Sequence, residues 1–133
     1  MMHSLMISFQ MNKISSFFGF LTYSKNNIEI NYIRGDEMNS VSLNYVLSMN
    51  NPIIIDIRDN YTYNQGHIKG AINIPYYNLL NNFSHYLNKN EKYYLYCENG
   101  RQSTEISNRL NSFGYNTSNI EGGYEGYLNS KYY

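Results

Sequence analysis

Cys97 is the only cysteine in the chain, and its position suits a nucleophile. It closes an aromatic and aliphatic run at 93–97 that has the composition of a buried strand. A lone cysteine is either a small buried hydrophobe or a reactive thiolate, so its surroundings must decide. The six residues that follow it would form a loop beside its sulfur: Glu98, Asn99, Gly100, Arg101, Gln102 and Ser103.

This loop would join the end of a strand to the beginning of a helix, which is where open α/β sheets carry their chemistry. Apolar residues recur at Ile106, Leu110 and Phe113, and Gly114 follows as a cap, so we predict a helix there. Backbone N–H groups of the loop and the positive end of the helix dipole would both stabilise an anionic sulfur. Gly100 permits the tight turn that the backbone needs if several N–H groups are to point at one sulfur atom. The context therefore favours a nucleophile at Cys97.

The elements that would position this loop alternate between strand and helix patterns. Such alternation predicts an α/β domain with a mainly parallel central sheet flanked by helices, and with the active loop between a strand end and a helix N-terminus. Strands are predicted at 40–42, 53–57, 71–74, 93–97 and 117–120. Helices are predicted from Leu43 over about two turns to an end at Asn50-Asn51-Pro52, after Pro75, at 106–113 and as a final turn at 124–128, with 66–70 as a loop.

Composition excludes several classes of protein. The 133 residues suffice for one ordinary domain, and a single cysteine excludes both an internal disulfide and a zinc site built on several thiolates. The net charge is zero, which does not suit non-specific nucleic-acid binding or a polybasic membrane surface. Hydrophobic residues make up 42% and charged residues 15%, a composition that favours a packed core over disorder. With three histidines in the chain, we expect no metal site.

Residues 1–37 differ from the rest of the chain. The stretch 5–21 is too short and too polar for a transmembrane helix, and it lacks the charged start of a signal peptide. We expect residues 1–37 to be an N-terminal arm that is either disordered or a translated leader, and 38–133 to be the functional domain. The leader hypothesis rests on Arg34-Gly35-Asp36, whose codons can pair with bacterial ribosomal RNA just before a start at Met38.

Four blocks in chain order resemble the rhodanese-like family of sulfurtransferases, over about residues 40–129. In this sequence they are Asp56-Ile57-Arg58; Tyr63 with Gly66-His67-Ile68-Lys69-Gly70-Ala71-Ile72-Asn73-Ile74-Pro75; Tyr96-Cys97 with Gly100 and Ser103; and Glu121-Gly122-Gly123-Tyr124 with Gly126-Tyr127. The last block has Tyr127 where the family usually has Trp. Any one of these blocks would be weak alone, whereas four in order are specific.

The resemblance implies a thiosulfate sulfurtransferase that works through a persulfide on Cys97. A donor such as thiosulfate would load the sulfur, and cyanide, a thiol or a protein acceptor would remove it, with no cofactor and no metal. Asp56 and Arg58 would bond loop ends, and His67 would order its loop rather than act as a base. For the whole protein we expect a cytoplasmic, bacterial monomer without nucleic-acid or membrane partners.

One position departs from the family pattern. The family often has Arg just before the loop serine, whereas this sequence has Gln102 there, with Arg101 one residue earlier. Glu98 partly cancels the charge of Arg101, so a dianionic donor should suit this loop less well than a cationic one.

Two other functions are open. Phosphatases and arsenate reductases share this fold, but they need an arginine six positions after the cysteine to clamp the oxyanion, and Ser103 stands there. Alternatively, the domain is a persulfide carrier or interaction module without turnover of its own, which needs the same cysteine and loop.

Overall fold

The computed structural model describes residues 17–23, 28–34 and 39–130, which fall into two compact units divided after Met38. In the first unit, β1 (Phe17–Tyr23) and β2 (Ile28–Arg34) form an antiparallel pair in which Phe17 faces Arg34 and Tyr23 faces Ile28. No strand is predicted from the sequence in residues 1–37. Apolar and polar residues alternate through most of 28–34, and this alternation, which has the period of a strand, could have predicted β2. Residues 1–16, 24–27 and 35–38 lie outside the described residues, so the expectations for the stretch 5–16 and for Met38 fall outside them as well.

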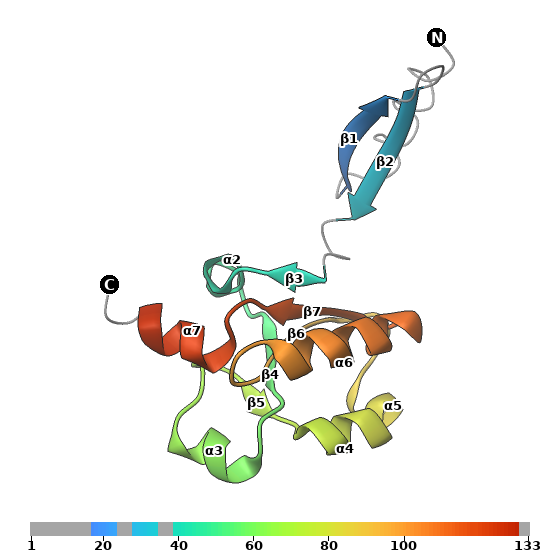
Figure 1. The fold of residues 1–133 in the computed structure, drawn as a ribbon. Helices are drawn as coiled ribbons and strands as arrows, with labels where there is room; N and C mark the ends of the chain where they lie inside the picture. Colours follow the sequence, from blue (N-terminus) through green and yellow to red (C-terminus); the bar gives the residue numbers. More distant parts are fainter. Residues whose placement is uncertain (1–16, 24–27, 35–38, 131–133) are drawn as a thin grey trace. The chain divides into compact units, whose positions relative to one another are not determined.

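The second unit is a five-stranded parallel sheet in the order β3-β7-β6-β4-β5, with helices on both faces (Figure 1). This confirms the predicted α/β architecture. Its strands are β3 (Ser40–Val41), β4 (Ile53–Asp56), β5 (Ile72–Asn73), β6 (Lys92–Tyr96) and β7 (Asn116–Ile120). Its helices are α2 (Leu43–Leu47), α3 (Asn60–Gln65), α4 (Tyr76–Asn81), α5 (Phe83–Tyr86), α6 (Arg101–Ser112) and α7 (Gly123–Ser130).

Side chains of the central strands fill two hydrophobic layers, one on each face of the sheet, because successive side chains of a strand point to opposite faces. Ile55 and Leu95 belong to the layer covered by α4, α5 and α6. Ile54 and Tyr96 belong to the layer covered by α2 and α7. This two-sided burial explains why the central strands are near-continuous apolar runs in the sequence.

Two helices were not identified from the sequence. Helix α3 lies in a stretch for which no element is predicted, because its residues are mostly Asn and Tyr without an apolar period. Its start is nevertheless marked by Asp59, whose carboxylate accepts the Thr62 N–H at 2.8 Å and the Thr62 hydroxyl at 2.9 Å. These hydrogen bonds hold the pKa of Asp59 below its ordinary value. The other missed helix, α5, is a single turn.

Candidate active site

Cys97 follows directly after β6, the middle strand of the sheet, and begins the loop that leads into α6. Since the strands are parallel, their carboxyl ends share one edge of the sheet. The same edge therefore gathers Arg58 after β4 and Gly123 after β7. The loop after Cys97 therefore lies beside residues from two other sequence blocks, those of Arg58 and Gly123.

The Cys97 sulfur is buried, with 3% of the residue exposed, and it lies close to two backbone N–H donors and one hydroxyl group. The Gly100 N–H lies 3.2 Å from Sγ and the Ser103 N–H 3.5 Å from it, while the Ser103 hydroxyl lies at 3.3 Å. Gly100 adopts φ +95°, the left-handed conformation that favours glycine and turns the chain into α6. Together with the start of a 12-residue helix, these donors form a small anion-stabilising cradle.

A chain of polar side chains leads away from the sulfur through the buried interior. The Ser103 hydroxyl contacts Asn119 Oδ1 at 2.6 Å, and Asn119 Nδ2 lies 3.1 Å from the hydroxyl of Ser40. Asn119 is 4% exposed and comes from β7, the strand beside β6, while Ser40 is in β3 at the sheet edge. Asn119 and Ser40 are not among the site residues predicted from the sequence, since nothing local distinguishes a polar residue in a strand.

Arg58 is the most heavily bonded side chain beside the loop. Its guanidinium contacts the Asp56 carboxylate at 2.6 and 3.0 Å and donates to the Gly66 carbonyl at 2.7 Å. It also lies 3.4 Å from the Glu98 carboxylate in the loop. Burial acts to lower the pKa of Arg58, but the hydrogen bond and charge of Asp56 outweigh it and raise that pKa above its ordinary value. Arg58 thus stays cationic and ties the ends of two loops together.

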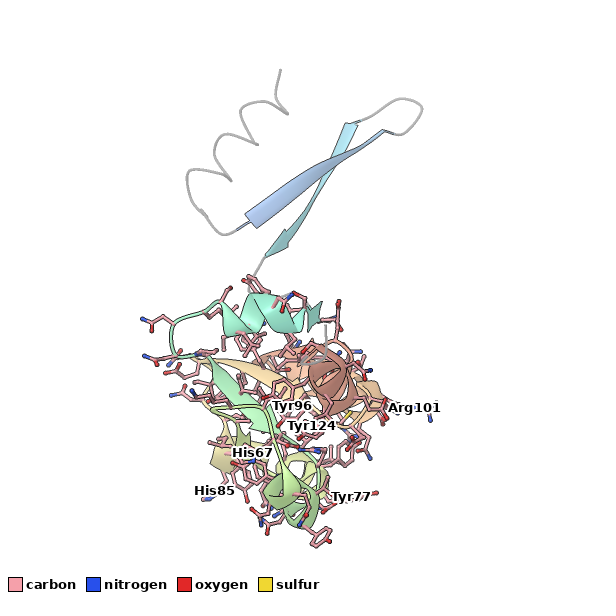
Figure 2. All side chains as sticks on the ribbon, turned by 90° about the vertical axis from the view of Figure 1, so that its left-hand side faces the viewer. His67, Tyr77, His85, Tyr96, Arg101 and Tyr124 are labelled. Carbon is pink, nitrogen blue, oxygen red and sulfur yellow. The ribbon has the colours of Figure 1, made fainter. Side chains whose placement is uncertain are left out.

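The Arg58 guanidinium also lies over two aromatic rings, Tyr124 from α7 and Tyr96 from β6. The Arg58 guanidinium lies 4.0 Å from the centre of the Tyr124 ring and 5.7 Å from that of Tyr96, the two rings labelled in the interior of Figure 2. Tyr96 is fully buried, and its hydroxyl accepts the Ile68 N–H at 3.0 Å. Burial, followed by the hydrogen bond and charge of Asp56, raises the pKa of Tyr96 well above its usual range. Tyr96 therefore acts as a neutral hydrogen-bonding group.

Backbone hydrogen bonds join the start of α7 to the loop that begins at Cys97. The Tyr124 N–H donates to the Cys97 carbonyl at 2.9 Å, and the Glu125 N–H donates to the Glu98 carbonyl at 3.0 Å. In a planar trans peptide the N–H points opposite to the carbonyl, so these two bonds turn the N–H groups of Glu98 and Asn99 away from α7.

The remaining predicted residues divide into two groups. His67 lies in the connection from β4 to β5 and contacts Tyr63, with its Nδ1 2.9 Å from the Tyr63 carbonyl and its ring stacked on the Tyr63 ring at 3.8 Å. The other group is exposed on the loop: Glu98, Asn99, Arg101 and Gln102. The Asn99 side chain accepts the Arg101 N–H at 3.1 Å, while the Arg101 side chain extends away from the domain (Figure 2).

A groove of about 400 Å³ opens beside the loop. Its walls include Glu98 and Gln102 from the loop and α6, Arg58 and Asp59 before α3, and the rings of Tyr76 and Tyr77 at the start of α4. Tyr77 is 69% exposed and projects from the surface in Figure 2. The groove is much larger than a small inorganic anion.

Neither a metal-binding cluster nor a membrane span is found in the part of the chain that the structure describes. Within 17–23, 28–34 and 39–130, no three His, Cys, Asp or Glu side chains are grouped so that they could hold a metal ion. In the same residues no helix is long and apolar enough to cross a membrane.

The chain matches the family model for the rhodanese-like domain over residues 42–130. No curated protein sequence matches it. Among solved structures, SSP1007 from Staphylococcus saprophyticus is 33% identical, with a TM-score of 0.59 over 65% of this chain and 89% of that one. A rhodanese-like domain protein from Staphylococcus aureus is 30% identical, with a TM-score of 0.56 over 65% and 87%. The rhodanese-like domain of an Anabaena protein is 29% identical, with a TM-score of 0.59 over 65% and 70%.

Proposed function

The chain belongs to the rhodanese-like domain family, and we propose that it is a sulfurtransferase that carries sulfane sulfur as a persulfide on Cys97. The observation that carries the proposal is the cradle around Sγ, with the Gly100 N–H at 3.2 Å, the Ser103 N–H at 3.5 Å and the Ser103 hydroxyl at 3.3 Å. Such donors stabilise an anionic sulfur without a proton-shuttling base.

In the first half-reaction the Cys97 thiolate attacks the outer sulfur of a donor such as thiosulfate. A bond forms between Sγ and that sulfur, the sulfur–sulfur bond of thiosulfate breaks, and its electron pair leaves on sulfite. The product is a Cys97 persulfide anion, so charge and atoms balance without an external oxidant or reductant. The buried cradle keeps negative charge stable on the sulfur pair while the leaving group departs.

In the second half-reaction a thiophilic acceptor attacks the outer sulfur of the persulfide. The bond to Sγ breaks, its electron pair returns to Cys97 as thiolate, and the acceptor leaves with the added sulfur. Cyanide serves as the acceptor in a simple assay, and a thiol is the acceptor class that we propose for the cell. The groove lined by Tyr76 and Tyr77 gives the body of an organic thiol a place to bind beside the loop.

Intact mass spectrometry after incubation with thiosulfate tests this function. We expect the protein to gain the mass of one sulfur atom, and cyanide to remove that mass with release of thiocyanate. Cys97→Ser is the control, because Ser is similar in size, should keep the fold and cannot form a persulfide. Sulfur loading in the Cys97→Ser variant, or no loading of the wild type by thiosulfate and by an organic persulfide alike, would contradict the proposal.

A further inference from the structure

The hydroxyl of Ser103 lies between two groups that compete for its single proton. On one side is Cys97 Sγ at 3.3 Å, and on the other is Asn119 Oδ1 at 2.6 Å. When the hydroxyl donates to Asn119, it offers only a lone pair to the sulfur, which suits a thiol S–H. A thiolate has no proton to give, and it needs the hydroxyl to turn and donate to it instead.

Asn119 can follow such a turn because its side chain carries both an acceptor and a donor. As the structure stands, its Oδ1 accepts from Ser103 and its Nδ2 donates to Ser40 Oγ at 3.1 Å. With the amide rotated by half a turn, Nδ2 would donate to the Ser103 oxygen and Oδ1 would accept from the Ser40 hydroxyl. Both hydroxyls can reverse their roles, so the two side-chain contacts of Asn119 are kept in either orientation.

Burial makes this reversibility important. Asn119 is 4% exposed and Ser103 is fully buried, so neither can replace a lost partner with bulk water. A side chain that could only accept at this position would leave its own acceptor unpaired whenever Ser103 turned to the thiolate. Gly100, which faces the Asn119 amide, has no side chain, and even a β-carbon there would keep 3.9 Å from both amide atoms. The amide therefore has room to rotate on that side.

We propose that Asn119 is a positioning residue for Cys97: its amide sets the direction of the Ser103 hydroxyl and reverses with the charge on the sulfur. The chain Ser40–Asn119–Ser103 thereby supplies the thiolate with a third donor, in addition to the two backbone N–H groups, without leaving a buried polar atom unpaired. The importance of this thiolate in catalysis rests on the proposed sulfurtransferase function, whereas the hydrogen-bond switch itself does not.

The test is the pH dependence of Cys97 alkylation by iodoacetamide in the full chain, followed by intact mass. Because Cys97 is the only cysteine, the readout is unambiguous and needs no sulfur donor. In Asn119→Asp the carboxylate only accepts, so it holds the Ser103 proton away from the sulfur. We expect the midpoint of the alkylation profile to rise by about one pH unit and the rate at pH 7 to fall about tenfold.

A carboxylate near the sulfur would also act through its charge, and a double-mutant cycle separates the two effects. In the Ser103→Ala background there is no hydroxyl to misdirect, so we expect Asn119→Asp to slow alkylation by no more than about threefold. Asn116→Asp is the matched control, since Asn116 lies on the same strand and already accepts from Lys92 Nζ at 2.9 Å. It should leave the profile unchanged.

Asn119→Leu removes the amide without adding a charge, and it shows whether the Ser103 hydroxyl can serve the sulfur when nothing at position 119 accepts its proton. Leu offers no acceptor, so the Ser103 hydroxyl keeps the sulfur as its partner, and the alkylation rate should stay near that of the wild type and above that of Ser103→Ala. An equal fall for Asn119→Asp in both backgrounds, no fall at all, or an Asn119→Leu rate as low as that of Ser103→Ala would overturn the proposal. Absence of sulfur loading with normal alkylation profiles would instead count against the proposed function alone.

The other ionisable groups around the loop are unchanged across this comparison, so their effects cancel in the cycle. They are Asp56, Arg58 and Tyr96 from the β4 and β6 ends, Glu98, Arg101 and Glu105 from the loop and α6, and Tyr124 and Glu125 from α7.

Discussion

Gly123 packs so closely against Cys97 that a β-carbon on Gly123 would lie 2.5 Å from the Cys97 carbonyl oxygen. It would also lie 2.6 Å from the Glu98 carbonyl oxygen, and Gly123 adopts φ +59°. Both carbonyls accept hydrogen bonds from the N–H groups that follow Gly123. The first turn of α7 and the nucleophile loop are therefore fitted backbone to backbone, with no space for a side chain.

We expect Gly123→Ala to impair both folding and sulfur loading. The added carbon must displace either α7 or the peptide at Cys97, and a shift of about 1 Å at a reacting group can cost a hundredfold in rate. Gly70→Ala is the control, because Gly70 also has a positive φ of 89° but has nothing within 4 Å of its β-carbon position. It should lose only about 1–2 kcal/mol of stability from backbone strain. Urea unfolding and intact-mass loading rates compare the two, and equal loading rates would show that the close packing does not position the loop.

Tyr96 should make the protein sensitive to alkaline pH. Its pKa is raised in the folded state, so above about pH 10 the unfolded chain loses this proton while the folded chain keeps it. The free energy of unfolding is then undiminished below pH 10 and falls by about 1.4 kcal/mol per pH unit above it. Tyr96→Phe removes this contribution, so the free energy of unfolding of the variant should fall less steeply between pH 10 and 11 than that of the wild type.

The same substitution also has a cost at neutral pH. Tyr96→Phe leaves the buried Ile68 N–H without its acceptor, which should lower the stability at pH 7 by about 1–3 kcal/mol. Chemical denaturation at pH 7 and at several values above pH 10 measures both effects. Parallel stability curves for the two proteins above pH 10 would show that Tyr96 ionises equally in the folded and unfolded states.

The sequence is most informative where the chain is locally regular. The run of β6, the turn at Gly100 and the apolar period of α6 together predict the location of Cys97 at a strand end, because each signal lies within a few residues of the sulfur. Helix α3 lacks an apolar period, and its capping residue Asp59 is the one local mark of its start. The start of α3 could therefore have been predicted from its N-capping residue, although not from an apolar period.

The contacts that tune the loop could not be predicted, because they join residues distant in sequence. Glu98 meets Arg58 across 40 positions, and Asn119 meets Ser40 across 79. A strand pattern fixes which face a residue occupies, but not which side chain on the neighbouring strand stands opposite. From the sequence, Glu98 is expected to offset the charge of Arg101, whereas the structure places the Glu98 carboxylate beside Arg58.

Residues 1–37 should be dispensable for folding and sulfur transfer. Strands β1 and β2 pair with each other and do not join the five-stranded sheet that carries Cys97. A chain that begins at Met38 should match the full chain in melting temperature and in the rate of sulfur transfer. A markedly lower melting temperature or a loss of solubility would show that the segment stabilises the domain, and would also count against its being a translated leader.

The charges on the loop should control the capture of an anionic donor. Among the described residues no hydrogen bond or ion pair engages the Arg101 guanidinium, which is exposed and extends away from the domain (Figure 2). One unit of charge several ångströms from a dianion in water is worth roughly 1 kcal/mol, or several-fold in binding. Arg101→Ala should therefore raise the KM for thiosulfate several-fold at low salt. Glu98→Gln should lower it, because it removes an anion and leaves the charge of Arg58 less compensated.

Arg109→Ala is the matched control for Arg101→Ala, since it removes an exposed arginine from the same helix at the end far from Cys97. It lowers the net charge equally but should leave the KM unchanged. Steady-state kinetics at two ionic strengths tests the cause, because an electrostatic effect on donor capture must shrink as salt rises. The attack of a neutral thiol on the persulfide should change little in either loop variant. An unchanged KM for Arg101→Ala at low salt would mean that the donors around Sγ bind thiosulfate without help from this cation.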